Sequence, residues 1–94
     1  MNQYEESARG ARASALLADD MFKEVIAELR QGIMDKWRSA PVRDIEGQHS
    51  LKLMDKLLTD IVGYIQSVAD TGKMAEIQLE QESKVANLRK YGIK

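Results

Sequence analysis

The sequence of 94 residues contains no cysteine, and this absence excludes several kinds of chemistry at once. Disulfide bonds, thiol catalysis and zinc sites built on thiolates all require cysteine. The sequence has one histidine, His49, and its six glycines are scattered, so it offers no glycine-rich phosphate loop. We therefore predict that the protein is not an enzyme and that it needs no cofactor.

Proline and aromatic residues are also scarce, with one Pro, one Phe, one Trp and three Tyr. The core must then consist of Leu, Ile, Val, Met and Ala. Lys and Arg number 14 against 15 Asp and Glu, which leaves no basic footprint for nucleic acid. No apolar run approaches the roughly 20 residues that span a bilayer, and the acidic start of the chain does not resemble a signal peptide. We expect neither a nucleic-acid nor a membrane partner.

The stretch from Asp44 to Thr71 dominates what the sequence does contain. Its apolar residues recur at alternating spacings of three and four, the rhythm of a helix packed against another helix. They are Leu51, Met54, Leu58, Ile61, Ile65 and Val68. Leu57 and Val62 widen this apolar face beyond what one neighbouring helix covers. We predict a long helix here, with part of its apolar face left for further contacts.

A second helix is predicted from Met21 to Ser39. Its apolar face consists of Phe22, Val25, Ile26, Leu29, Ile33, Met34 and Trp37. Asp19 and Asp20 precede it and can cap its N-terminus. We interpret Gly32 as a point of close helix approach. Trp37 is interpreted as a plug in the core, with a binding hot spot as the alternative.

Pro41 marks the one clear turn, because it cannot continue a helix and disfavours helical geometry at Ala40. Asp44 is then the predicted N-cap of the long helix. A connection this short makes the two helices an antiparallel hairpin, in which Trp37 and Met34 lie near Leu51. The predicted centre of the hairpin consists of Leu29, Ile33, Leu58, Ile61 and Ile65.

The two ends of the chain are predicted to be helical as well. A first helix over Glu5–Ala18 has small residues at helical spacing, which predict its buried face. They are Ala8, Ala11, Ala15 and Ala18, together with Tyr4. Gly72 is interpreted as the C-cap of the long helix. The segment Met74–Tyr91, with only a thin apolar stripe, is a docked fourth helix, a continuation of the third, or an arm that reaches a partner.

The predicted fold class is therefore all-α: an antiparallel helical hairpin with an additional N-terminal helix and a C-terminal helical arm. Residues 1–73 are predicted to form a small helical domain, and residues 74–94 a C-terminal extension. The uncovered apolar face of the long helix predicts an interface through Leu53, Leu57 and Tyr64. The C-terminal arm is predicted to grip the partner, and its candidate interface residues are Ile77, Val85, Leu88 and Tyr91.

Glu46 and His49 have the spacing found in di-metal carboxylate bundles. Such a site needs a second copy of the motif and two further glutamates. Glu24 and Glu28 of a symmetric dimer are candidates, but they belong toward the opposite end of the hairpin. We therefore predict no metal site and a solvated His49. A helix-turn-helix DNA reader is a further alternative, and the length and the aspartates of the long helix argue against it.

From Ala11 to Ala75 the chain resembles a group of short, uncharacterised helical proteins encoded by tailed bacteriophages and prophages. The resemblance is carried by Ala15–Phe22, Trp37–Pro41, Leu51–Leu58 and Asp70–Ala75, and by Asp44, Glu46 and Gly47. It transfers no site residues. It implies a phage structural or assembly accessory, located in the host cytoplasm or the virion. The wide apolar face of the long helix predicts that its partner is a second copy or a larger phage structural protein. The alternatives are a small host-directed inhibitor or regulator and a packaging factor associated with nucleic acid.

Overall fold

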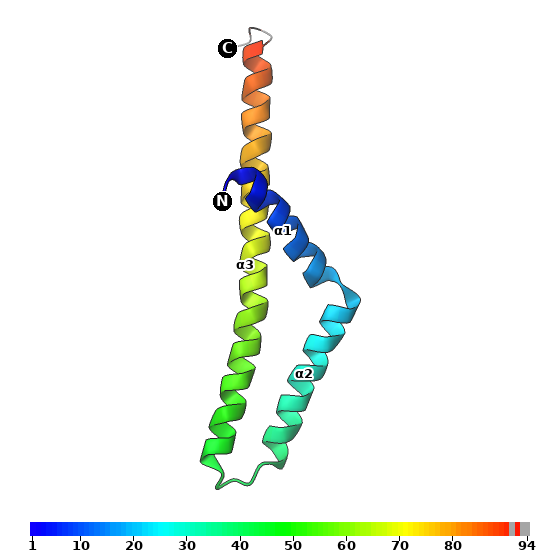
Figure 1. The fold of residues 1–94 in the computed structure, drawn as a ribbon, viewed down its shortest axis with the longest axis vertical. Coiled ribbons are helices and arrows are strands. Elements are labelled where there is room, and N and C mark those ends of the chain that lie inside the picture. Colours follow the sequence, from blue (N-terminus) through cyan, green and yellow to red (C-terminus); the bar gives the residue numbers. More distant parts are fainter. Residues whose placement is uncertain (91, 93–94) are drawn as a thin grey trace. The chain divides into compact units, whose positions relative to one another are not determined.

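The computed structural model describes residues 1–90 and 92, and these residues form three α-helices and no strand (Figure 1). Helix α1 spans Gln3–Ala18, α2 spans Asp20–Ser39 and α3 spans Ile45–Lys90. The predicted all-α class is confirmed. The chain divides into two compact units, one made of residues 1–15 with α3 from Gln66 onward, the other of Leu16–Ile65. The division at residue 73 stays a prediction.

Both predicted N-caps of the second unit are present. The backbone N–H of Phe22 donates to Asp19 Oδ1 at 2.8 Å, and that of Gly47 donates to Asp44 Oδ1 at 3.0 Å. Each carboxylate accepts a hydrogen bond from an N–H group that has no partner inside its helix. Its negative charge also interacts favourably with the positive N-terminal end of the helix dipole. Helix α2 therefore begins at Asp20, one residue before the predicted start.

Residues 40–44 connect α2 to α3 in the predicted turn. The backbone of Ala40 is extended, with φ −68° and ψ 137°, because the ring of Pro41 disfavours helical geometry in the residue before it. The side-chain amide of Gln48 donates to the carbonyl oxygens of Pro41 and Val42 at 3.1 and 3.0 Å. The first turn of α3 thereby holds the connection, and α2 runs antiparallel to residues 45–65 of α3 as the α2–α3 hairpin (Figure 1).

The hairpin is thinly packed along the seam where its two helices meet. Leu58, with 9% of its surface exposed, is the only large apolar side chain that is buried among the described residues. Ile33 and Ile65 are half-buried, whereas Leu29 and Ile61 are exposed. The predicted centre is therefore only partly right. Two helices cover one seam between them, and the side chains beside that seam face outward.

The other unit depends on small residues where α1 packs against α3. Gly10 and Gly72 are both buried, and a Cβ built on either glycine would collide with the backbone of the other. Ala13 of α1 and Ala69 and Ala75 of α3 are buried as well. Side chains this small allow the two backbones to come close together.

Two polar side chains form hydrogen bonds at the N-terminal end of α1. The N–H of Glu5 donates to Asn2 Oδ1 at 2.8 Å, which makes Asn2 the N-cap of α1. The Nε2 group of Gln3 donates to Oε1 of Gln78 at 2.6 Å and links α1 to α3. This cap was not predicted, and α1 begins two residues before the predicted Glu5.

Two predictions for this unit are wrong. Gly72 is not a C-cap, because α3 continues through it to Lys90 and its φ is not positive. The segment after residue 73 is therefore a continuation of α3, one of the three alternatives. The predicted alanine face of α1 is exposed, and the face with Gly10 and Ala13 is buried instead. The two backbones are so close that only glycine and alanine fit between them, and Gly72 is one of these residues.

Candidate protein-interaction surfaces

The α2–α3 hairpin has a groove on each side of its seam. The first, here called the apolar groove, has a volume of about 390 Å³. It is lined by Glu28, Leu29, Gly32, Ile33 and Lys36 of α2 and by Met54, Leu57, Leu58 and Ile61 of α3. The second, here called the tryptophan groove, has a volume of about 590 Å³. It is lined by Arg30, Ile33, Met34, Trp37, Ile45, Gln48, His49, Leu51, Lys52 and Asp55.

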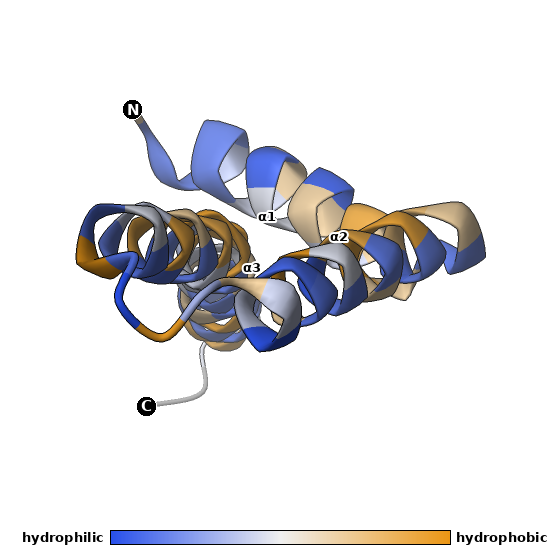
Figure 2. Ribbon diagram, turned by 90° about the horizontal axis from the view of Figure 1, so that it is seen from below, coloured by the Kyte–Doolittle hydropathy of each residue, from blue (hydrophilic) through white to orange (hydrophobic). Residues whose placement is uncertain are grey.

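The apolar groove leaves large side chains in contact with water. Leu29 is 50% exposed, Met54 53%, Leu57 61% and Ile61 47%. These exposed parts together equal about two whole side chains, and covering them would contribute on the order of 3–6 kcal/mol. Hydrophobic residues recur along both helices (Figure 2). A contiguous apolar surface of this kind usually marks an interaction site.

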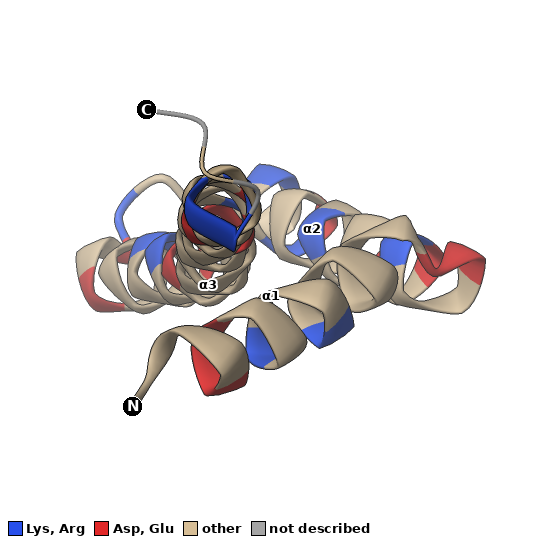
Figure 3. Cartoon of the chain, turned by 90° about the horizontal axis from the view of Figure 1, so that it is seen from above, with Lys and Arg blue, Asp and Glu red and all other residues tan. Residues whose placement is uncertain are grey.

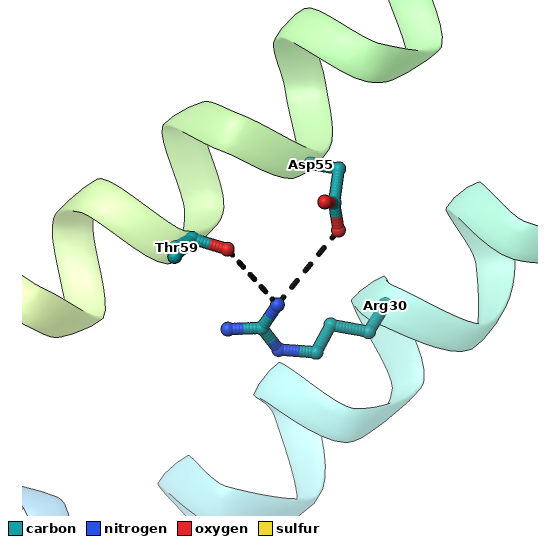
Figure 4. A network of polar contacts seen from close by, with 3 residues as sticks. All are labelled: Arg30, Asp55 and Thr59. Carbon is teal, nitrogen blue, oxygen red and sulfur yellow. Dashed lines mark hydrogen bonds and ion pairs between the residues drawn. The ribbon is translucent and has the colours of Figure 1, made fainter.

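Polar contacts link α2 to α3 at Arg30 and Asp55, two residues that line the tryptophan groove (Figure 4). Arg30 Nη1 of α2 donates to Thr59 Oγ1 of α3 at 3.1 Å and lies 3.7 Å from Asp55 Oδ1. Both charged side chains are well exposed, so solvent screens the ion pair and it contributes at most about 1 kcal/mol. This side of the hairpin is therefore more polar than the apolar groove.

Trp37 does not plug the core. Its side chain is 54% exposed, and it lines the tryptophan groove beside Met34 and Leu51. The predicted proximity of Trp37 and Met34 to Leu51 is confirmed, while the predicted burial of Trp37 is wrong. Trp37 lies in the last turn of α2, close to the connection to α3, and the hairpin leaves more than half of its surface exposed. A role as a binding hot spot stays a hypothesis.

The structure exposes every predicted interface residue that it describes. Exposed fractions range from 46% at Val85 and Leu88 to 64% at Tyr64, and Tyr91 lies outside the described residues. Leu57 lines the apolar groove, and Leu53 and Tyr64, four residues before and seven after it, share its face of α3. The remaining three, Ile77, Val85 and Leu88, belong to the C-terminal part of α3 in the other unit. Contact of any of these residues with a partner stays a prediction.

Several residues of the apolar groove were assigned to other roles from the sequence. Leu29 and Ile61 were predicted in the centre of the hairpin, and Gly32 as a point of close approach within the chain. Apart from the surrounding backbone of α2 itself, no atom lies within 4 Å of a Cβ built at Gly32, so no other part of the chain approaches closely there. The sequence signal for this groove was the width of the apolar face of the long helix, which is wider than a single neighbouring helix can cover.

The described residues contain no group of three or more His, Cys, Asp or Glu that could hold a metal ion. Residues 1–90 and 92 also include no buried polar or charged side chain. Acidic and basic residues are interspersed along the helices (Figure 3). The absence of a metal role for His49 stays a prediction.

None of the helices formed by the described residues combines the length and the apolar character of a membrane span.

The chain is thus an all-α protein whose hairpin presents an apolar groove between two helices. Comparison with protein-family models, with curated proteins and with solved structures found no match. The resemblance to phage-encoded proteins therefore stays a prediction.

Proposed function

We propose that the protein is a phage structural or assembly accessory that acts through helix-mediated protein–protein interaction. The observation that carries this proposal is the apolar groove, where Leu29, Met54, Leu57 and Ile61 are about half exposed. Water contact of these side chains is unfavourable, and a partner helix would relieve it. The resemblance over residues 11–75 supplies the phage setting. The role needs no catalytic group, cofactor or metal.

Mass spectrometry of particles purified from cells that carry the gene tests this proposal. A structural or assembly accessory is expected in the particles, or in their assembly intermediates, in many copies. Substituting Leu57 by Lys, which places a charge in the apolar groove, should prevent incorporation. The matched control is Val42→Lys, which puts the same charge on a turn residue that is 93% exposed and lines neither groove.

Absence of the chain from both particles and intermediates, together with its presence in infected cells, contradicts the proposal and favours a host-directed inhibitor or regulator. Binding to nucleic acid with an affinity that falls steeply with salt would instead favour a packaging factor, because phosphate contacts release counterions.

A further inference from the structure

One row of residues along α2 has a symmetric arrangement of charge. Glu28, Gly32 and Lys36 follow each other at intervals of four residues, and all three line the apolar groove. Residues at this spacing lie one above the other on a helix. Gly32 is the midpoint, with a carboxylate one turn before it and an ammonium group one turn after it. Neither Glu28 nor Lys36 forms an ion pair within the described chain.

We infer that the apolar groove is occupied by a second copy of this chain, related to the first by a two-fold axis beside Gly32. This inference rests on the proposed function, since it names the partner of the helix-mediated interaction. A two-fold axis perpendicular to α2 sets the two copies of α2 antiparallel. Glu28 then faces the partner's Lys36, and Lys36 faces the partner's Glu28.

The charges favour a second copy over another occupant. A surface that binds its own copy must be self-complementary. If one residue of the first copy contacts a second residue of the partner, the second residue of the first copy also contacts the first residue of the partner. Glu28 and Lys36 meet this condition, since they lie at equal distances along the chain from Gly32 and carry opposite charges. The same charge at both positions would repel across the axis.

Gly32 fits the position at the centre of such an interface. Open space surrounds the point where its side chain would be, so the glycine is not needed for packing within the chain. Between two copies of α2, the missing side chain would allow the backbones to come close. Two hairpins joined in this way form a four-helix bundle. In this bundle the apolar groove of each copy is covered by the other copy. The tryptophan groove, which Arg30 lines, stays outside this interface.

Sedimentation equilibrium of the full chain over a micromolar concentration range tests the inference. The unsubstituted chain is expected to dimerise. Glu28→Lys and Lys36→Glu should each weaken the dimer about tenfold, because two attractions become two repulsions. The matched control is Lys56→Glu, the same charge reversal at an exposed residue that lines neither groove, and it should leave the dimer unchanged.

An equimolar mixture of the Glu28→Lys and Lys36→Glu variants gives the sharpest test of the two-fold axis. In the mixed dimer one copy is basic at both positions and the other is acidic at both, so two attractive pairs form again. The mixture should recover the dimer that each variant alone loses. The double variant, with both charges reversed, should also dimerise as strongly as the original chain. Recovery by mixing also shows that both variants are folded.

A substitution of Gly32 tests the close approach independently of charge. Gly32→Gln has room for its side chain within the chain and should remain helical by circular dichroism. Its bulk should weaken the dimer about tenfold or more, by separating the two copies of α2. Gly63→Gln is the matched control, since a Cβ at Gly63 also meets no atom within 4 Å, but that residue does not line the apolar groove.

Three results would overturn the inference. If the chain stays monomeric across the whole concentration range, a second copy does not occupy the apolar groove. The proposed function would still hold in that case if the chain is incorporated into particles. A dimer that is insensitive to the charge reversals and to Gly32→Gln places the interface elsewhere. Failure of the mixed variants to recover the dimer excludes a two-fold axis beside Gly32.

Discussion

The two compact units of this chain use opposite kinds of helix contact. Where α1 meets α3, the buried residues are glycines and alanines, and Gly10 and Gly72 bring two backbones together. In the α2–α3 hairpin the helices meet through large apolar side chains, of which only Leu58 is buried among the described residues. One contact is close and leaves little room for change. The other is loose and leaves apolar surface for a partner.

The comparison shows that apolar content alone does not locate a buried contact. The hairpin carries more large apolar side chains than its seam can cover, so many of them face outward. The contact of α1 with α3 buries small side chains and depends on shape, because any added atom meets backbone that cannot rotate away. Substitutions should therefore act by loss of volume in the hairpin and by gain of volume at Gly10.

The largest effect is expected from Leu58→Ala in the hairpin. Removing a buried leucine side chain should lower the free energy of unfolding by roughly 2–5 kcal/mol, through lost burial and the cavity left behind. Leu57→Ala, at a neighbouring residue that is 61% exposed, is the matched control and should cost less than about 1 kcal/mol in dilute protein. Denaturant unfolding measures both. A change below about 0.5 kcal/mol for Leu58→Ala would remove that residue from the core.

A smaller loss is expected from Gly10→Ala. The added methyl group collides with the backbone at Gly72, and overpacking of this kind costs roughly 1–3 kcal/mol, more than the gain in helix propensity. Hydrogen exchange should show reduced protection of the α1 amides, with the hairpin amides less affected. Unchanged protection in α1 would mean that the two backbones are farther apart than the structure places them.

The same substitution at Gly32 should have the opposite sign. A methyl group there meets no atom within 4 Å, so Gly32→Ala should raise the free energy of unfolding by up to about 1 kcal/mol through helix propensity. The measurement requires protein dilute enough to be monomeric, because the proposed dimer brings a second backbone to this position. Destabilisation of the monomer would show that Gly32 has a neighbour within the chain.

The smallest effect is expected from His49→Gln. His49 is an exposed side chain in the tryptophan groove, and its substitution should change the free energy of unfolding by less than about 0.5 kcal/mol and leave assembly intact. Metal analysis of protein purified without added metal completes the test. Stoichiometric iron, manganese or zinc that disappears in the variant would contradict the prediction that His49 has no metal role.

Local signals in the sequence were sufficient to predict α1, α2, the start of α3, the turn and two of the three N-caps, whereas the predicted end of α3 at Gly72 was wrong. Asp19 and Asp44 accept hydrogen bonds from residues three positions away, and Pro41 acts on the residue before it. Interactions of this range depend only on neighbouring residues, so they can be recognised in a single sequence. The exposed predicted interface residues, such as Leu57, followed from the width of the apolar face.

The role of each glycine and the buried face of each helix were decided by tertiary structure. From the sequence, Gly72 looked like a helix end and Gly32 like a close contact, whereas Gly72 makes the close contact and Gly32 faces open space. Intrinsic propensity treats both glycines alike, because it contains no information about which distant backbone lies opposite. Burial of Gly10 and Ala13 depends on their position against residues about sixty places further along the chain. Local sequence determined where the helices begin, and packing between distant residues determined which of their faces remain free.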